Sequence, residues 1–471
     1  MIVLRPYQEK ALTDIRHAYA SGARSVCLVA PCGAGKTVIF SRIAQLASAK
    51  KTRIGILVHR DSLLTQASEK LDDCGVEHGI IAPGYSSRGE RVQVASVQTL
   101  VRRLDRHEFD FLVVDESHHA VSPTYLKIFA RWPEAHILGV TATPCRTNGQ
   151  GLNFIFQKLI LGPNISDLIA DGYLVEPVTY GPSHALNLSK VKTSMGDYDL
   201  KQLAAHMDQP RITGDAVDHY KKICPGSPAM VFTVDVKHAE DVAAAFSAAG
   251  FKAASVDGKM DLRIIRERIA GLSDGSVQVL SSCNIVSEGV DIPNVVAAIM
   301  LRPTRSLSLH IQQAGRALRP IYTQGHDLSM RVDRLAAITA SKKPKAIILD
   351  HAGNVFRFST VDEPHPWTLE GRKKRKRDEG TIHLRQCPKC AHTHKTSPRC
   401  PICGHVYEIS SKDPEPEDGT LSKIDKIALR RARWKQVAQA RTLEELQFIA
   451  KARGYHHGWP YHILRERAAK K

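Results

Sequence analysis

The sequence predicts an α/β protein built as two tandem parallel-sheet lobes, with a small cysteine-bearing module and a helical tail behind them. Three observations lead to this prediction. Short apolar, β-branched segments alternate with segments of helical period, and the series occurs twice, which is typical of parallel sheets with crossover helices. Four of the ten cysteines stand in two CxxC pairs. A chain of 471 residues, 43% of them hydrophobic, can bury two or three cores.

The first lobe is predicted over residues 1–150. Its strands are expected at Ser25–Ala30, Ile54–His59, Val92–Ala95, Phe111–Asp115 and His136–Thr141, with helices at Thr37–Ser48 and Ser62–Asp73. The interval 151–225 is polar and punctuated by glycine and proline. We interpret it as a linker and insertion with a helical patch at Asp199–Met207.

A second lobe of the same kind is predicted over residues 226–360. Its strands are expected at Ala229–Thr233, Ala253–Val256, Val277–Leu280, Val295–Leu301 and Ala346–Asp350. Helical periods lie between them, at Lys237–Ala249, Asp261–Gly271 and Leu307–Leu318. The sequence therefore predicts two similar lobes in tandem.

The C-terminal part is predicted as three pieces. Residues 361–384 form a basic linker whose run Arg372–Arg377 fits either a phosphate tether or a flexible charged connection. Residues 385–410 form the cysteine module, and residues 420–471 form a basic tail with helices at Leu421–Ala440 and Leu443–Arg453. The tail also carries aromatic residues that suit either base stacking or helix packing, namely Tyr455, Trp459 and Tyr461.

The charge balance is strongly basic. The formal net charge is +18, from 66 Lys and Arg against 48 Asp and Glu. Such an excess of positive charge attracts polyanions such as nucleic acid. The alternative explanation of the charge is a well-solvated, soluble surface. No apolar run reaches the length of a membrane helix, and the start lacks a leader pattern, so we expect a cytoplasmic protein without a membrane partner.

A phosphate-binding loop is predicted at Ala30–Thr37, which reads APCGAGKT between an expected strand and an expected helix. The backbone of Gly33, Ala34 and Gly35 can approach phosphate oxygens at the helix N-terminus. Lys36 can reach the β- and γ-phosphates of ATP, and Thr37 can bind Mg²⁺. A glycine turn without nucleotide is the alternative.

Two acids, Asp115 and Glu116, stand at the carboxyl end of a predicted strand, in the sequence DESHH. The carboxyl ends of parallel strands meet at one edge of a sheet, so these acids are expected to face the phosphate loop. Asp115 suits a magnesium ligand and Glu116 suits the carboxylate that positions an attacking water. Ordinary caps at a strand end remain the alternative.

The order of motifs over roughly the first 350 residues resembles the DEAD/DEAH group of superfamily 2 helicases, whose fold is a pair of RecA-like lobes. Arg5–Gln8 resembles the Q element, in which Gln8 would contact adenine. Three further stretches resemble first-lobe motifs, the first two in contact with the nucleic-acid strand and the third coupling hydrolysis to lobe movement: Leu57–Gln66, Ser96–Leu100 and Thr141–Pro144.

The second lobe continues the resemblance. Val231–Glu240 is similar to the motif that opens this lobe, and Ser287–Pro293 is similar to the GxDxP element, which implies that Gly289 and Asp291 lie near the γ-phosphate. Gln312–Arg319 matches QxxGRxxR, which implies that Arg316 and Arg319 are the cations that reach the ATP held by the other lobe. Gln313 replaces an arginine found in many members, and Ser117 replaces the alanine of DEAH.

A narrower likeness is to the bacterial RadD helicases and related phage-encoded helicases. It depends on LRPYQ, on Asp167–Leu174, on Leu301–Pro320 and on Leu349–Asn354 ahead of a cysteine module. This resemblance implies a role in DNA repair or recombination in a bacterial cell or phage-infected host. It also implies a possible single-strand-binding protein or recombinase as partner.

The cysteine module has the spacing of a structural zinc site. Two CxxC knuckles nine residues apart can present four thiolates to one tetrahedral ion. We therefore expect a zinc-ribbon-like module that uses metal binding for its folding energy, with unligated thiols or disulfides as the alternative. The predicted zinc ligands are Cys387, Cys390, Cys400 and Cys403.

Together these observations predict an ATP-dependent nucleic-acid translocase or helicase, with ATP, Mg²⁺ and Zn²⁺ as cofactors. DNA is favoured over RNA as substrate, contacts are expected mainly to the backbone, and the protein is expected to be monomeric. Two other functions remain open. One is a motor that moves on duplex without separating strands, and the other is a zinc-bearing nucleic-acid-binding adaptor that ATP switches between shapes.

Overall fold

A computed structural model provides the fold. It describes residues 3–85, 89–145, 151–182, 188, 191–194, 197–207, 210–283, 292, 294–370, 384–386, 393–395, 399, 404–406, 421–423, 434, 436–440, 442–453, 455 and 458–468. The chain divides into two compact units. The first runs to Leu168 and includes a short segment beginning at Trp367, and the second contains most of the remainder.

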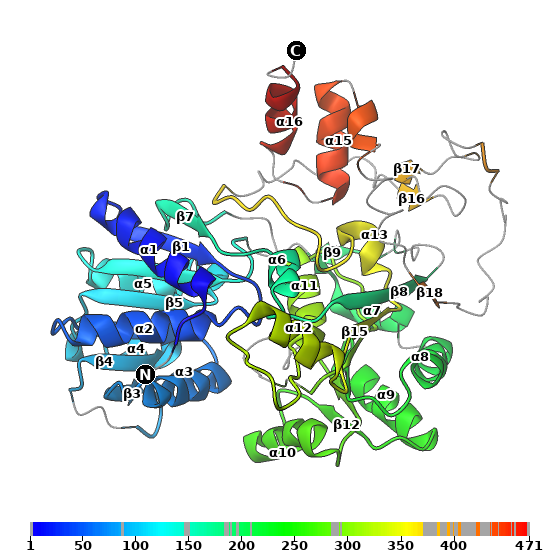
Figure 1. The fold of residues 1–471 in the computed structure, drawn as a ribbon, viewed down its shortest axis with the longest axis horizontal. Coiled ribbons are helices and arrows are strands. Elements are labelled where there is room, and N and C mark those ends of the chain that lie inside the picture. Colours follow the sequence, from blue (N-terminus) through cyan, green and yellow to red (C-terminus); the bar gives the residue numbers. More distant parts are fainter. Residues whose placement is uncertain are drawn as a thin grey trace. The chain divides into compact units, whose positions relative to one another are not determined.

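The first lobe contains a seven-stranded sheet in which every neighbouring pair is parallel (Figure 1). The strand order is β3-β4-β2-β5-β6-β1-β7. The predicted strands are confirmed to within one residue at their ends. The sheet also contains β3 and β7, which the sequence does not predict. The bounds of the seven strands are β1 Ser25–Val29, β2 Ile54–Val58, β3 His78–Ile81, β4 Val92–Ser96, β5 Phe111–Asp115, β6 His136–Thr141 and β7 Lys158–Leu161.

Helices cover both faces of this sheet, so its central strands are buried along their whole length. Alternate residues of β1 show the two faces, because Val26 and Leu28 join one apolar cluster while Cys27 and Val29 join the other. The helices are α1 Pro6–Ala20, α2 Lys36–Ser48, α3 Asp61–Asp73, α4 Val97–Leu100 and α5 Pro123–Arg131, with 3₁₀ turns η1 Leu104–Arg106 and η2 Ser117–His119.

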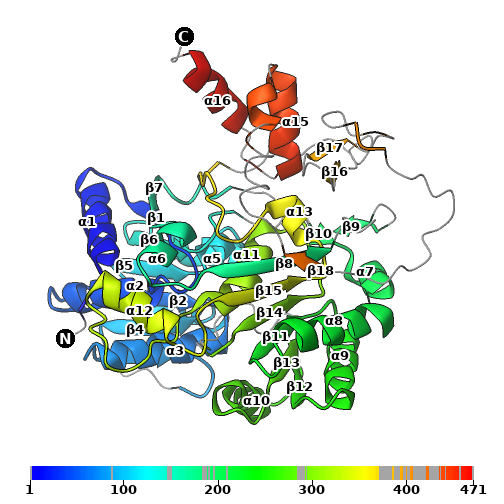
Figure 2. The same cartoon turned by 45° about the vertical axis from the view of Figure 1, so that its right-hand side comes forward.

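The second lobe also contains a seven-stranded sheet, with the order β12-β13-β11-β14-β15-β8-β18 (Figure 2). All neighbouring pairs are parallel except β8 with β18. The bounds are β8 Pro177–Pro182, β11 Ala229–Phe232, β12 Ala253–Val256, β13 Val279–Ser282, β14 Ala297–Met300, β15 Ala346–Asp350 and β18 Leu421–Lys423. The prediction of two parallel-sheet α/β lobes is therefore confirmed.

Three helices of the second lobe begin at side-chain caps. Asp235 accepts a hydrogen bond from the His238 amide, Asp261 from the Arg263 amide, and Ser306 from the Leu309 amide. These caps open α9 Val236–Ala248, α10 Leu262–Asp274 and α11 Leu307–Gly315. The other helical elements of this lobe are α7 Leu200–Met207, α8 Pro210–Ile223, η3 Arg316–Leu318, α12 Arg331–Thr339 and α13 Asn354–Phe358, and α6 Ile165–Ala170 spans the point in the chain where the two units divide.

The interval interpreted as a linker and insertion does more than connect the lobes. Its β7 extends the first sheet beside β1, and its β8 joins the second sheet beside β15. Tyr220 of α8 lies fully buried in the core of the second lobe. Between these elements β9 Thr193–Ser194 and β10 Asp197–Tyr198 form a short antiparallel pair. Such brief strands carry too few residues for a readable period.

The segment predicted as a basic linker contains residues, from Trp367 onward, that belong to the first lobe. The carbonyl of Leu369 accepts hydrogen bonds from the amides of Leu152 and Asn153, and its side chain joins the apolar cluster around Phe156. The linker prediction depended on the charge run that begins at Arg372. Two apolar residues ahead of that run, Trp367 and Leu369, gave no periodic signal.

The C-terminal region contains short strands, helical residues at 434 and 436–439, and the helices α15 and α16 among its described residues. β16 Leu384–Gln386 pairs antiparallel with β17 Thr393–Lys395, and α15 Leu443–Arg453 packs with α16 Trp459–Ala468 around Leu446 and Ile449. The helix predicted to begin at Leu421 is not seen there, because Leu421–Lys423 instead pairs as β18 with the edge of β8. The open hydrogen-bonding edge of β8 explains why a strand forms at this place.

No helix in the described part of the chain has both the length and the apolar content required to cross a lipid bilayer.

Candidate active site

The phosphate loop lies where the sequence predicts it, between β1 and α2. Gly33 and Gly35 have φ angles of 84° and 74°, in the left-handed region that favours glycine. A Cβ atom on Gly35 would lie 2.5 Å from Nε2 of Gln8, so the close approach also requires glycine. The Lys36 ammonium folds back over the loop and donates to the carbonyl of Ala30 at 3.3 Å. The conformation of the loop thus depends on its glycine backbone.

The N-terminal helix α1 supports this loop through two side chains. Nε2 of Gln8 and the hydroxyl of Tyr7 both donate to the carbonyl of Ala34, at 3.1 and 3.0 Å. Oε1 of Gln8 accepts from the amide of Arg5 at 3.0 Å, and the Gln8 residue is only 2% exposed. Gln8 therefore braces the phosphate loop. The predicted contact of Gln8 with adenine stays a prediction.

Two buried carboxylates lie at the end of β5, which is two strands from β1 in the sheet. Asp115 is 6% exposed and Glu116 is 7% exposed. Glu116 has φ 47° and ψ 54°, a left-handed conformation that is uncommon for a residue with a side chain. The strain that this conformation carries is typical of residues held for function.

Electrostatics link Asp115 to the phosphate loop. Burial and the neighbouring Glu116 carboxylate raise the pKa of Asp115 to about 6, and the charge of Lys36 and a hydrogen bond from the Glu116 amide oppose this rise. The structure thus brings Lys36 and the two acids together at one edge of the first sheet. Two adjacent buried acids beside one lysine leave an excess of negative charge that a divalent cation would neutralise.

The residues present fit Mg²⁺. The carboxylate of Asp115 and the hydroxyl of Thr37 at the start of α2 are hard oxygen donors of the kind that this ion prefers. When bound with ATP, Mg²⁺ supplies neutralisation of the phosphate charge. Within the described residues, no group of three or more His, Cys, Asp or Glu side chains is arranged to hold a metal ion. If Asp115 and Thr37 bind the ion as predicted, the nucleotide and water would supply its remaining ligands.

Three histidines connect the acids to neighbouring motifs. Nδ1 of His118 lies 3.3 Å from Oε2 of Glu116 and 3.2 Å from the hydroxyl of Thr141. The His119 ring lies 4.1 Å from that of His118 and 4.3 Å from that of His59. Contacts thus run from His59, in the motif predicted to contact the nucleic-acid strand, to Thr141, in the motif predicted to couple hydrolysis to lobe movement. The sequence analysis assigns no role to these histidines, although the pair His118 and His119, one residue after the acids, was a signal.

The second lobe places the predicted cations at the end of a buried helix. Arg316 opens the 3₁₀ turn η3 directly after α11 and is 9% exposed, and Arg319 follows the same turn. Lys343 is fully buried, and its burial together with the Arg319 guanidinium lowers its pKa to about 7. Gly289 and Asp291 lie outside the described residues, as do the four cysteines Cys387, Cys390, Cys400 and Cys403.

Comparison with known proteins adds independent findings. Residues 1–146 match the family model described as "Type III restriction enzyme, res subunit", and residues 215–320 match "Helicase conserved C-terminal domain". A 51.5 kDa protein of a Lactococcus phage is 29% identical, over 77% of this chain and 73% of the phage protein. The protein IRC3 of Saccharomyces cerevisiae, described as an ATP-dependent helicase, is 30% identical over 69% of this chain.

The chain spans 50% of the length of the yeast relative. Among solved structures, a fragment of an HsdR subunit of a type I restriction enzyme from Vibrio vulnificus superimposes with a TM-score of 0.58. Its sequence identity is 20%, and the match covers 75% of this chain and 65% of that fragment. This likeness shows a shared fold.

Proposed function

This chain belongs to the superfamily 2 helicases and is an ATP-hydrolysing enzyme, and from that premise we propose that it uses ATP to translocate along DNA. The grouping of Lys36 with two buried acids carries the hydrolytic part of the proposal. A loop and a lysine are enough to bind phosphate. A second buried carboxylate, Glu116, is needed where an attacking water must be oriented.

Arg316 and Arg319 are the cations that we assign to the second lobe. The assignment rests on the QxxGRxxR resemblance. Guanidinium groups suit the task because their planar forks stabilise charge on the transferred phosphoryl oxygens. A triphosphate held from both lobes would couple its hydrolysis to a change in their relative position.

DNA is the substrate that the observations favour. The family model that matches the first lobe is named after a subunit of a restriction enzyme, and restriction enzymes act on DNA. The net charge of +18 favours binding to a phosphate backbone. Contacts through Leu57–Gln66 and Ser96–Leu100 would engage mainly that backbone, so we expect weak sequence specificity.

The biological role that we propose is DNA repair, recombination or phage DNA metabolism. It is supported by the resemblance to RadD and phage helicases and by the similarity to a phage protein. A single-strand-binding protein or recombinase is the partner class that this role would require. The four-cysteine spacing supports a zinc module as a docking element, again as part of the proposal.

The test is ATPase activity measured in parallel with single-stranded DNA, duplex DNA, forked DNA and RNA, with Lys36→Ala as the blank. We expect stimulation of severalfold or more by at least one DNA, less by RNA, and none in the Lys36→Ala variant. Equal rates with and without every polymer would overturn the motor and favour the adaptor. Strand-displacement assays distinguish the two kinds of motor. An enzyme that displaces the third strand of a triplex but does not separate the strands of forked DNA would be a motor that moves on duplex DNA.

A further inference from the structure

The insertion of the second lobe is fastened to the loops that follow two neighbouring strands. Val191, Leu203 and Met207 of the insertion form a small apolar cluster with Val234, which follows β11. On its polar side, β10 presents Asp197 to the loop that follows β14, residues 302–306. The insertion thus contacts the loop that leads directly into α11.

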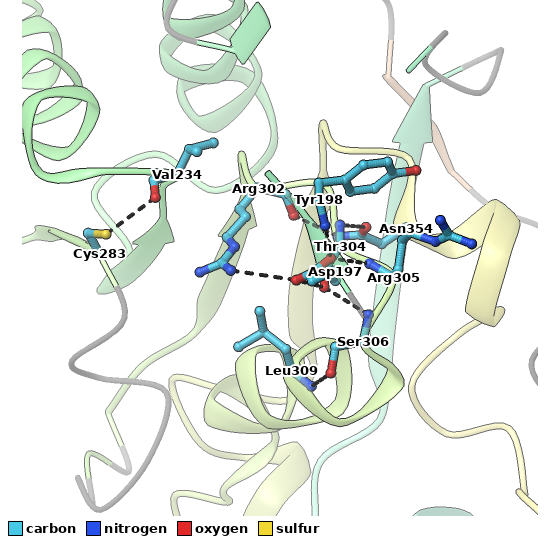
Figure 3. A network of polar contacts seen from close by, with 10 residues as sticks. All are labelled: Asp197, Tyr198, Val234, Cys283, Arg302, Thr304, Arg305, Ser306, Leu309 and Asn354. Atoms are coloured by element: carbon cyan, nitrogen blue, oxygen red, sulfur yellow. Dashed lines mark hydrogen bonds and ion pairs between the residues drawn. The ribbon is translucent and has the colours of Figure 1, made fainter. Parts of the chain in front are cut away.

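Asp197 is the centre of this contact (Figure 3). Its Oδ2 atom accepts a hydrogen bond from the hydroxyl of Thr304 at 2.8 Å and lies 3.5 Å from a guanidinium nitrogen of Arg302. Its Oδ1 atom accepts from the amides of Arg305 at 2.6 Å and of Tyr198 at 2.9 Å. Asp197 is 9% exposed, so these contacts are made with little competition from water.

The hydrogen bonds continue from Asp197 into the helix. The Thr304 hydroxyl accepts from the amide of Ser306 at 2.9 Å, and the Ser306 hydroxyl caps α11 by accepting from the Leu309 amide at 3.2 Å. The side chain of Asn354, which lies after β15, also holds this loop. It accepts a hydrogen bond from the Thr304 amide and donates one to the Arg302 carbonyl. The loop therefore has one defined conformation.

A displacement at the start of α11 would reach its end. Residues on all sides of this helix are buried, including His310, Ile311 and Gln313, so it can shift only as a rigid body within its packing. Arg316 directly follows the last residue of α11. The carboxylate in the insertion and the guanidinium at the helix end are therefore mechanically connected.

We propose that Asp197 is a positioning residue for Arg316, through the Thr304 and Ser306 hydrogen bonds and helix α11. The proposal rests on the proposed function, because it takes Arg316 to act on ATP. Errors of about 1 Å in the placement of a group that acts in the transition state can lower a rate by up to about 100-fold. The insertion would thus tune the hydrolytic step of the motor without touching the nucleotide.

Four variants of the full-length protein test this. Asp197→Asn keeps an acceptor for the two amides but loses the charge opposite Arg302 and places N–H groups opposite Thr304. Thr304→Val removes the linking hydroxyl and leaves the Asp197–Arg302 ion pair intact, and Thr304→Ser restores the hydroxyl. Asp199→Asn is the matched control, because it removes the same charge from the same insertion at a residue that caps only the Gln202 amide.

We expect Asp197→Asn and Thr304→Val to lower the kcat of ATP hydrolysis on the order of tenfold, with KM for ATP changed less than about twofold. Thr304→Ser and Asp199→Asn are expected to stay near the parent rate. Thermal unfolding of each variant shows whether it is folded. If Asp197→Asn does not fold, the kcat of Thr304→Val tests the inference alone.

Combination with Arg316→Lys separates positioning from a general loss of structure. If Asp197 acts through Arg316, adding Asp197→Asn to Arg316→Lys lowers kcat little further, because the planar fork it positions is already gone. The inference would be overturned if the losses in kcat of the two single variants multiply in the double variant. It would also be overturned if Asp197→Asn and Thr304→Val are folded and keep the kcat of the parent. Failure of the proposed function appears differently, as a parent enzyme whose ATPase no DNA stimulates.

Discussion

The imidazole rings of His59 and His119 lie 4.3 Å apart, with their planes tilted by 50°. His59 directly follows β2 in the motif expected to contact the nucleic-acid strand, and His119 belongs to the DESHH sequence that holds the two acids. His118 extends the contact to Glu116 at 3.3 Å. A strand bound near His59 can therefore influence the carboxylate that we assign to the attacking water.

This relationship predicts the behaviour of His119→Ala. Removal of the ring breaks the contact with His59 and leaves the phosphate loop and both acids in place. The stimulation of ATPase by DNA should fall at least about threefold, while the basal rate changes less than about twofold. The measurement is steady-state ATPase with and without DNA, with His17→Ala on the exposed face of α1 as control. Unchanged stimulation in His119→Ala would mean that the ring contact transmits nothing.

The hydrogen bond from Gln8 to the Ala34 carbonyl gives this side chain a second candidate role besides contact with adenine. If Gln8 only braces the phosphate loop, Gln8→Ala raises KM for ATP and for GTP by the same factor, about tenfold. If it also reads adenine, the loss is confined mainly to ATP, because only a base-reading group distinguishes the two nucleotides. Steady-state kinetics with both nucleotides decide between these roles.

Tyr7→Phe serves as a control for Gln8→Ala, because it removes one hydrogen bond to the Ala34 carbonyl without altering an amide. It should affect ATP and GTP equally. A preference for ATP that disappears in Tyr7→Phe would show that the loop itself, and not Gln8, sets base selectivity.

The raised pKa of Asp115 predicts a pH-dependent stability. The folded protein binds this proton more tightly than the unfolded chain, so the stability of the nucleotide-free protein falls as pH rises from about 4 to about 6, and the deficit is complete at pH 7. Asp115→Asn should therefore stabilise the nucleotide-free protein at pH 7, by at most about 3 kcal/mol. It should also lower ATPase at least about 100-fold, because a magnesium ligand is lost.

The check is thermal unfolding of Asp115→Asn and the parent without nucleotide or Mg²⁺, at pH 7 and at pH 4.5. The difference in Tm should shrink at the lower pH. Asp105→Asn, at an exposed carboxylate, should show no such pattern. A Tm difference that is the same at both pH values would contradict the assignment of the raised pKa to Asp115.

The cysteine spacing predicts one zinc ion per chain. Protein purified without chelators should contain close to one equivalent of zinc, and Cys387→Ser should lose most of it, because three thiolates leave the tetrahedral shell open. The measurement is elemental analysis after gel filtration. Cys74→Ser, at a half-buried cysteine of the first lobe, is the control and should retain the metal. Metal content near zero in the parent would refute the zinc assignment.

Sequence and structure contributed to different parts of the site. The phosphate loop and the acids of DESHH were predicted because their chemistry resides in consecutive residues whose flanking strand and helix are readable from local period. Gln8 was predicted as a base contact, and only the fold shows it holding the Ala34 carbonyl. The sequence does not predict β7 and β8 in the segment 151–225. Both are short strands, and they pair with strands that lie far away in the chain.

By itself, the sequence determined that this protein has two parallel α/β lobes, a phosphate loop with paired acids, and a basic character. These properties follow from local patterning, where residues three or four apart already specify the element. The tertiary structure alone decided which side chains meet across distance, as with Asp197 and Thr304, which are 107 residues apart. Such contacts depend on how strands and loops are ordered in a sheet, and a local pattern carries no information about that order.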